Sequence, residues 1–191
     1  IKPYRVARKS CKRPPSPVLI YRPEEFKAAH AFVEKPVSVD IVSRLLASIK
    51  QRFGIEPDVV ILGRYGISEM LKRKLRARVS VPKRVVDGAL LLSAASLFIS
   101  GGGGTMLGEA ALLGVPTISA SQFENHVERY LIRRRLVFKS DSLRENLEFA
   151  RMALTFDQGL ITRLEKRSAA LLGEMTDPTR EIATKIIRSV S

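Results

Sequence analysis

The sequence has no tryptophan, a single cysteine (Cys11) and two histidines among its 191 residues. One cysteine excludes a disulfide scaffold and indicates a reducing, cytoplasmic setting. Two histidines and one cysteine, far apart in the chain, show no metal-ligand spacing, so we expect neither a metal site nor a cofactor. Asparagine and glutamine are also scarce, which is typical of proteins from thermophiles.

Long apolar runs are absent as well. The longest nearly uncharged stretch, residues 88–108, is interrupted by glycines and ends on polar residues, which does not suit a membrane span of about 20 apolar residues. We also expect no signal peptide. With 45% hydrophobic and 27% charged residues, the composition is typical of a globular protein, and the length predicts one large domain.

Acidic residues are few relative to basic ones: 19 Asp and Glu against 33 Lys and Arg, for a formal charge of +14. This charge makes nucleic acid a candidate partner, but a solvated basic surface explains it equally well. The eight phenylalanines and four tyrosines lie mostly within apolar runs and form no evident stacking platform for bases, so a nucleic-acid module is the weaker alternative. Because the chain begins with Ile1 and not Met, we expect a fragment that lacks an amino-terminal domain.

The chain divides into three parts. Residues 1–17 are basic and proline-rich, which predicts an arm or interdomain linker. An α/β domain is expected over residues 18–154, and helices that pack on it or cross from it over residues 155–191. Apolar runs typical of strands occupy residues 18–21, 59–62, 78–81, 97–100, 116–119 and 136–138, and they alternate with predicted helices at residues 39–53, 88–95, 106–113, 143–154 and 179–190.

Nearly continuous apolar strands between helices indicate a parallel sheet that is covered on both faces. We therefore predict a doubly wound, Rossmann-like α/β fold with about six strands. Ligands bind such sheets outside the carboxyl ends of the strands, near the switch point of strand order. The predicted functional loops are therefore those after Tyr21, Leu62, Ser100 and Ser119.

The loop after the strand at residues 97–100 contains four glycines and a threonine: Gly101, Gly102, Gly103, Gly104 and Thr105. Without Cβ atoms, a ligand can approach the backbone N–H groups closely. The start of the following helix adds a partial positive charge, which suits phosphate. A tight turn without a ligand remains the alternative, although it needs fewer glycines.

Two familiar nucleotide loops do not fit this run. The dinucleotide fingerprint requires a third glycine where the chain has Met106 or Leu107, and a P-loop requires lysine where it has Glu109. A carboxylate repels phosphate, but it accepts hydrogen bonds from hydroxyl groups such as those of a ribose. The pattern thus indicates phosphate at the glycines and a sugar diol one helical turn further on; the alternative for Glu109 is an ion pair with a nearby arginine.

The order Gly-Gly-x-x-Thr-Met-x-x-Glu-Ala-Ala-x-x-Gly-x-Pro, from Gly101 to Pro116, resembles the nucleotide-sugar motif of GT-B glycosyltransferases of the MurG type and of UDP-N-acetylglucosamine 2-epimerase. Residues 87–119 are closer still to an uncharacterised, largely archaeal family related to both. The resemblance covers roughly residues 18–154. It implies the Rossmann-like, carboxyl-terminal half of a GT-B fold that binds a UDP-sugar as substrate and acts with its amino-terminal domain.

The resemblance also implies roles for individual residues. In MurG-like enzymes the motif glutamate holds the ribose hydroxyls, which assigns that role to Glu109, and a shared Gln-x-x-Asn is matched by Gln122 and Asn125. The first predicted strand is followed by a basic segment, as in the epimerase, so Arg22 is a diphosphate candidate. Arg64, after the second strand, is another.

For each of these residues a structural role is the alternative. Arg22 and Arg64 can be solvated or paired with glutamates, and turn chemistry alone can require Gln122 and Asn125. The catalytic residues are unknown; His30 and His126, the only imidazoles, are weak candidates.

A basic run, Arg133 to Arg135 with Lys139 near it, is typical of a solvated helix end. It could also hold the protein against an anionic membrane surface, which would make the protein peripheral to the membrane. A GT-B-like scaffold domain without a ligand is a third alternative for the chain as a whole. The sequence leaves the sugar, the acceptor and the oligomeric state open.

Overall fold

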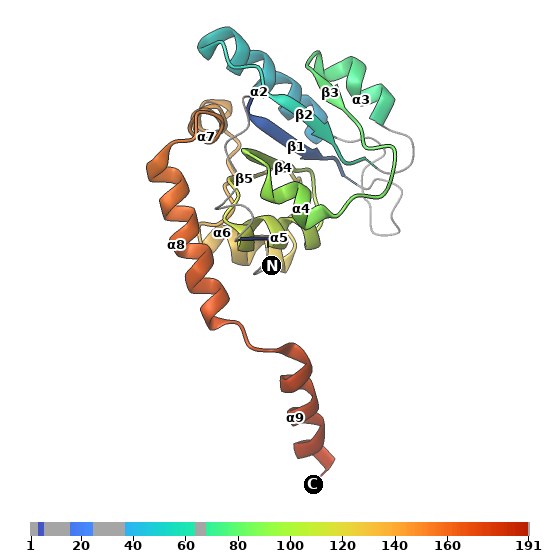
Figure 1. Cartoon of the computed structure of the whole chain (residues 1–191), viewed down its shortest axis with the longest axis vertical. Helices are drawn as coiled ribbons and strands as arrows, with labels where there is room; N and C mark the ends of the chain where they lie inside the picture. Colours follow the sequence, from blue (N-terminus) through green and yellow to red (C-terminus); the bar gives the residue numbers. More distant parts are fainter. Residues whose placement is uncertain (1–3, 6–15, 25–36, 64–67, 191) are drawn as a thin grey trace.

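The computed structural model describes residues 4–5, 16–24, 37–63 and 68–190. Its centre is one parallel sheet with the strand order β3-β2-β1-β4-β5 (Figure 1). The strands are β1 (Val18–Arg22), β2 (Asp58–Ile61), β3 (Val79–Ser80), β4 (Leu97–Ser100) and β5 (Thr117–Ser119). The order runs outward from β1 to β3 on one side and from β4 to β5 on the other, so the switch point lies between β1 and β4. The predicted doubly wound, Rossmann-like fold is confirmed.

The helices of the described chain are α2 (Ser38–Phe53), α3 (Ser68–Leu75), α4 (Gly88–Ser93), α5 (Thr105–Leu113), α6 (His126–Arg133), α7 (Leu143–Leu154), α8 (Gln158–Glu174) and α9 (Pro178–Val190). Five of them, α2, α4, α5, α7 and α9, coincide with predicted helices to within one or two residues. Helices α3 and α6 were not predicted, and α8 lies within residues 155–191, where helices were predicted without bounds for this one.

Two separate apolar clusters cover the two faces of the sheet. Leu19 and Tyr21 of β1 point into the cluster formed with α2, α3 and α7, while Ile20 points into the cluster formed with α4, α5 and α6. Successive residues of a strand face opposite sides, so a run that is apolar at every position needs a cover on each face. The sheet therefore buries β1 and β4 completely apart from their ends.

The prediction of about six strands is too high, because the sheet has five. The predicted strand at residues 136–138 makes only a single parallel bridge, between Phe138 and Ile118. Leu136 instead donates its N–H to the carbonyl of Leu131, which closes the end of α6. Since the Leu136 N–H is bonded to the end of α6, Phe138 is the residue of this segment that pairs with β5.

Helix α8 packs on the domain through the buried side chains of Leu160, Leu164 and Leu171. Helix α9 projects away from the rest of the chain (Figure 1), and its described side chains are exposed. No helix in the described ranges is long and apolar enough to cross a membrane.

Candidate functional site

The loops that follow β1 and β4 meet at the switch point of the sheet. Gly101, directly after β4, donates its N–H to the carbonyl of Arg22 at the end of β1, with a distance of 2.7 Å. The glycine run and the segment from Arg22 to Glu24 are therefore neighbours at the carboxyl edge, where this fold class binds ligands.

Backbone conformation or close packing favours glycine at three of the four positions in this run. Gly102 and Gly103 have φ angles of 154° and 94°, which residues with a Cβ rarely adopt, and a Cβ on either would meet no atom within 4 Å. A Cβ on Gly101 would lie only 2.6 Å from the hydroxyl of Ser38 and 2.7 Å from Oε2 of Glu24. Gly101 thus permits close packing, whereas among the described residues no atom lies within 4 Å of a Cβ on Gly102 or Gly103, and the Gly102 N–H is donated to the Ser100 hydroxyl.

The amino terminus of α5 is open. Its N-cap residue, Gly104, has no side chain to cap the helix, and the first backbone bond of the helix is donated by Gly108 to the Gly104 carbonyl. In the part of the chain that the structure describes, the N–H groups of residues 103–107 find no acceptor. These groups and the helix dipole favour an anion.

The amino terminus of α2, at the same edge, is capped by a side chain of the protein, that of Glu24. The Glu24 carboxylate accepts the N–H of Ser38 at 2.7 Å and the Ser38 hydroxyl at 2.5 Å. The same hydroxyl lies 2.6 Å from that of Tyr21, which is fully buried, and burial raises the pKa of Tyr21. Of the two helix starts at the switch point, α2 therefore holds the Glu24 carboxylate, whereas no carboxylate of the described residues binds the start of α5.

Arg22 lies where the sequence predicted a diphosphate ligand. Its side chain is half-buried, and its guanidinium Nη1 approaches the sulfur of Met106, in the first turn of α5, at 3.6 Å. A cation is thus placed beside the open helix start. Arg64 and His30, the other two candidates from the first part of the chain, lie outside the described residues.

Glu109 lies one turn further along α5 and is half-buried. Its carboxylate faces the start of α4, since a Cβ on Gly88 would lie 3.8 Å from Glu109 Oε2. Within the described ranges the carboxylate has neither a hydrogen bond nor an ion pair, so the alternative of an arginine partner finds no support there. An acceptor without a partner is what a ribose diol requires.

Two further polar groups near Glu109 were not singled out as site residues from the sequence. The Tyr4 hydroxyl donates a hydrogen bond to Asp87 Oδ2 at 2.6 Å, and Asp87 caps α4 by accepting the N–H of Leu90. These bonds lower the pKa of Asp87, and Asp87 together with the charge of Glu109 raises the pKa of Tyr4. Tyr4 is distant in sequence from Asp87, so no spacing pattern could reveal the pair.

The segment that follows β5 reaches the glycine loop through α6. A Cβ on Gly104 would lie 3.8 Å from the Val127 side chain, so the first turn of α6 adjoins the loop. Asn125 caps α6, because its Oδ1 accepts the N–H of Glu128 at 2.8 Å. Turn chemistry therefore accounts for one end of the Asn125 amide, while Gln122 and His126 are exposed.

Below this segment lies a buried polar cluster that the sequence did not indicate. Glu128 is 1% exposed, and its Oε1 accepts the hydroxyls of Ser119 and Ser121 at 2.5 and 2.7 Å and lies 3.3 Å from the Lys139 ammonium. Its Oε2 is buried without a hydrogen-bond partner in the described part of the chain. The carboxylate ties the carboxyl end of β5 to α6, so it orients the segment that carries Gln122 and Asn125.

Known structures with a similar fold include glycosyltransferases and an epimerase. MurG of Acinetobacter baumannii matches 86% of this chain with a TM-score of 0.56 and 14% identity, and UDP-GlcNAc 2-epimerase of Neisseria meningitidis, in complex with UDP-GlcNAc, matches 90% with a TM-score of 0.55 and 13% identity. The spinosyn rhamnosyltransferase SpnG matches 92% with a TM-score of 0.59 and 17% identity. The chain covers 48%, 47% and 48% of these three proteins, respectively. It therefore has a GT-B-like fold corresponding to about half of each.

A sequence relative comes from an archaeon. The uncharacterised protein MJ0665 of Methanocaldococcus jannaschii is 30% identical over 141 residues, which are 73% of this chain and 36% of that protein. The chain thus spans about a third of the length of its relative. Residues 8–190 match the family described as protein of unknown function DUF354, and the chain belongs to that family.

Proposed function

We propose that this chain is the nucleotide-sugar-binding half of a GT-B-like glycosyltransferase or sugar epimerase. The diphosphate of a UDP-sugar binds at Gly102, Gly103 and the start of α5, next to the Arg22 guanidinium. Glu109 accepts hydrogen bonds from the ribose hydroxyls. Gln122 and Asn125 lie on the adjoining segment and contact the sugar side of the ligand.

The observation that carries this proposal is the contrast between the two helix starts at the switch point. Glu24 supplies the negative charge that the start of α2 favours, whereas the start of α5 has unpaired N–H groups among the described residues and a cation beside it. Each charged hydrogen bond to a phosphate oxygen is worth roughly 1.5–3 kcal/mol. The start of α5 is therefore the place at this edge where an external dianion gains most.

The chemistry follows from this placement. Backbone N–H groups, the helix dipole and Arg22 stabilise the charge that develops on a leaving diphosphate, so breaking the bond to the sugar requires no metal ion from this chain. In GT-B proteins the sugar reacts in a cleft between two domains. Because the chain spans 36% of its relative, we expect the isolated chain to bind the nucleotide without turning it over.

Calorimetric titration with UDP, UDP-N-acetylglucosamine and a single-stranded oligonucleotide at two salt concentrations tests the proposal. We expect saturable UDP binding that Glu109→Ala weakens about tenfold or more, since two charge-assisted hydrogen bonds are lost. Arg22→Gln should weaken UDP but leave uridine unaffected. Glu181→Ala, an exposed glutamate on α9, is the matched control and should bind UDP like the unmodified chain.

Three results would contradict the proposal. The first is the absence of saturable UDP binding, and the second is an equal loss in Glu109→Ala and Glu181→Ala. The third is oligonucleotide binding that falls steeply with salt in a chain indifferent to UDP, which would favour the nucleic-acid alternative.

A further inference from the structure

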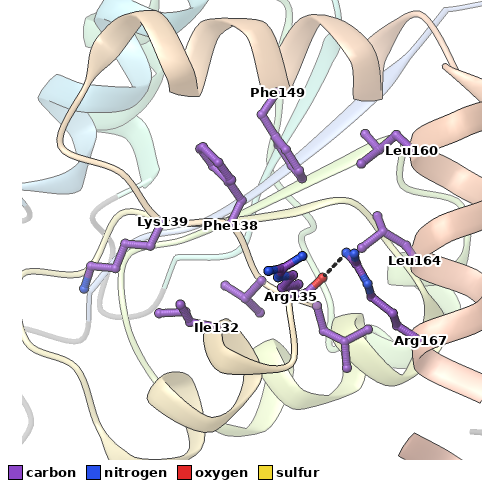
Figure 2. A pocket seen from close by; sticks show the side chains of 10 residues that line it. Ile132, Arg135, Phe138, Lys139, Phe149, Leu160, Leu164 and Arg167 are labelled. Atoms are coloured by element: carbon purple, nitrogen blue, oxygen red, sulfur yellow. Dashed lines mark hydrogen bonds between the residues drawn. The ribbon is translucent and has the colours of Figure 1, made fainter. Parts of the chain in front are cut away.

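A pocket of about 300 Å³ lies at the edge of the sheet beyond β5, between the segment after α6 and the helices α7 and α8 (Figure 2). Its wall is mostly apolar: Ile132, Leu136, Phe138, Phe149, Leu160 and Leu164. The rings of Phe138 and Phe149 stack with their centroids 4.7 Å apart and an interplanar angle of 8°. This volume is at the lower end of the range for sites that bind small molecules.

Two arginines, Arg135 and Arg167, also line this pocket. Figure 2 shows the Arg167 guanidinium donating to the main-chain carbonyl of Arg135, with an Nη1 to oxygen distance of 3.0 Å. Neither arginine has a carboxylate partner among the described residues. A guanidinium has five N–H donors in a planar fork, so Arg167 retains donors for a ligand after this bond.

Two other cations near Arg135, those of Arg134 and Lys139, are already paired with carboxylates. Arg134 binds the carboxylate of Glu174 through two nitrogens, and the Lys139 ammonium lies 3.3 Å from carboxylate oxygens of Glu124 and Glu128. The run from Arg133 to Arg135 is therefore not one uniform solvated patch, because Arg135 alone lines the pocket.

The backbone of Arg135 is also unusual. It has a φ of +54°, in the left-handed region, directly after the C-cap of α6. This position at a helix end is normally occupied by glycine, which lacks the Cβ that disfavours the conformation. Arg76 and Phe156, which lie at the ends of α3 and α7, have the same left-handed conformation without lining the pocket, so this backbone marks a helix end and does not by itself indicate a ligand.

We propose that this pocket binds a small amphipathic anion. The apolar body of the ligand packs against Phe138, Phe149 and Leu164, and its carboxylate or phosphate head is held by Arg135 and Arg167. Planar guanidinium groups suit such heads because they can donate two parallel hydrogen bonds. This site does not depend on the nucleotide proposal, since it uses none of the same residues.

Titration of the full chain with octanoate, followed by calorimetry and by the methyl NMR signals of leucine, tests the inference. Octanoate has an eight-carbon chain and one carboxylate, so it fits the expected size and charge. We expect saturable binding with a dissociation constant of about 1 mM or below, accompanied by shifts of the Leu160 and Leu164 methyl signals. Octan-1-ol, which has the tail without the charge, and acetate, which has the charge without the tail, should each bind at least about tenfold more weakly.

Two variants remove the cations without emptying the core. Arg135→Gly suits the left-handed backbone, so the chain should remain folded while octanoate affinity falls about tenfold or more. Arg167→Met keeps an apolar stem and should weaken octanoate similarly. Arg133→Gln, which removes an exposed arginine that does not line the pocket, is the matched control and should leave the affinity unchanged.

Several outcomes would overturn the inference. One is no saturable octanoate binding in a chain whose thermal unfolding shows that it is folded. Another is equal binding of octan-1-ol, and a third is a loss in Arg133→Gln as large as that in Arg135→Gly. A fourth is association with phosphatidylglycerol vesicles but not with free octanoate, which would assign the basic residues to a membrane surface.

Discussion

Glu128 offers the sharpest test of how the segment after β5 is held. Replacing it with alanine removes a carboxylate that accepts from the hydroxyls of Ser119 and Ser121 and lies 3.3 Å from the Lys139 ammonium. Glu128→Gln keeps the shape and an acceptor for the hydroxyls but removes the charge. The two variants therefore separate the loss of the whole side chain from the loss of its charge.

The magnitude follows from burial. Removing one partner of a buried ion pair costs about 3–5 kcal/mol. Lys139 is 18% exposed and keeps Glu124 at 3.3 Å, and one oxygen of Glu128 already lacks a partner among the described residues. We therefore take the lower limit and expect the free energy of unfolding to fall by about 3 kcal/mol in Glu128→Ala and by about 1–2 kcal/mol in Glu128→Gln.

Urea unfolding followed by circular dichroism measures these differences, provided that the dependence on urea concentration stays the same in all variants. Glu124→Gln is the control, because Glu124 is a more exposed partner of the same lysine and a surface pair contributes at most about 1 kcal/mol. The reasoning is refuted if Glu128→Ala costs less than about 1 kcal/mol, or if Glu124→Gln costs as much as Glu128→Ala.

The remaining predictions concern the glycines and the acid response. Gly103→Ala should lower the free energy of unfolding by roughly 1–2 kcal/mol, since its φ is +94°. Gly108→Ala, inside α5 with no atom within 4 Å of the new Cβ, should raise it by about 0.5–1 kcal/mol; a thermal or urea transition that orders the two variants the other way contradicts this. Because the Tyr4 hydrogen bond lowers the pKa of Asp87 in the folded chain, that carboxylate stabilises the fold above its unfolded pKa of about 4, and the contribution is lost as the pH falls through the lower folded value. In Tyr4→Phe, an NMR titration should show the pKa of Asp87 rising toward its ordinary value, and an unchanged pKa would count against the contact.

Most of the sheet could be predicted from local sequence. Residues 97–100 form an uninterrupted apolar run between polar or glycine-rich segments, and they are β4 without any change of bounds. A strand that is buried on both faces favours an apolar side chain at each position, so it can be recognised from the sequence alone. The predicted helix at residues 143–154 also has the observed bounds of α7, because the Ser142 hydroxyl caps its start by accepting the N–H of Glu145; the carboxylate of Glu145 accepts from Ser140 and not from the Ser142 N–H.

Local sequence did not predict the structure of residues 136–138, nor the bounds and burial of α8. The segment 136–138 has the apolar character of a strand, but the end of α6 takes the backbone of Leu136. Helix α8 carries its buried leucines on one stripe among many charged residues, and only packing against the domain makes that stripe part of the core. For residues 136–138 the deciding partner is the end of the preceding helix, whereas for α8 it is the distant surface of the domain.

The same division applies to the candidate site. The glycine run and Arg22 were singled out because they follow apolar strands, and Glu109 because it stands where a P-loop has lysine and matches the glutamate of the nucleotide-sugar motif. That Glu24 caps the start of α2 could not be found in this way, because the bond joins residues 14 positions apart in the chain. The proposal of an anion site at the start of α5 depends on the difference between that helix start and the start of α2, which Glu24 caps.

By itself, the sequence determined the strand-and-helix alternation, the parallel sheet and the edge at which a ligand should bind, because each depends on neighbouring residues and on the 2.0 and 3.6 periodicities of strands and helices. Only the tertiary structure decided which charges are already neutralised. Arg134 and Arg135 are adjacent in the chain, yet one is paired with Glu174 and the other lines an apolar pocket. Successive residues at a helix end point in different directions, and the partners they meet there are brought by distant segments.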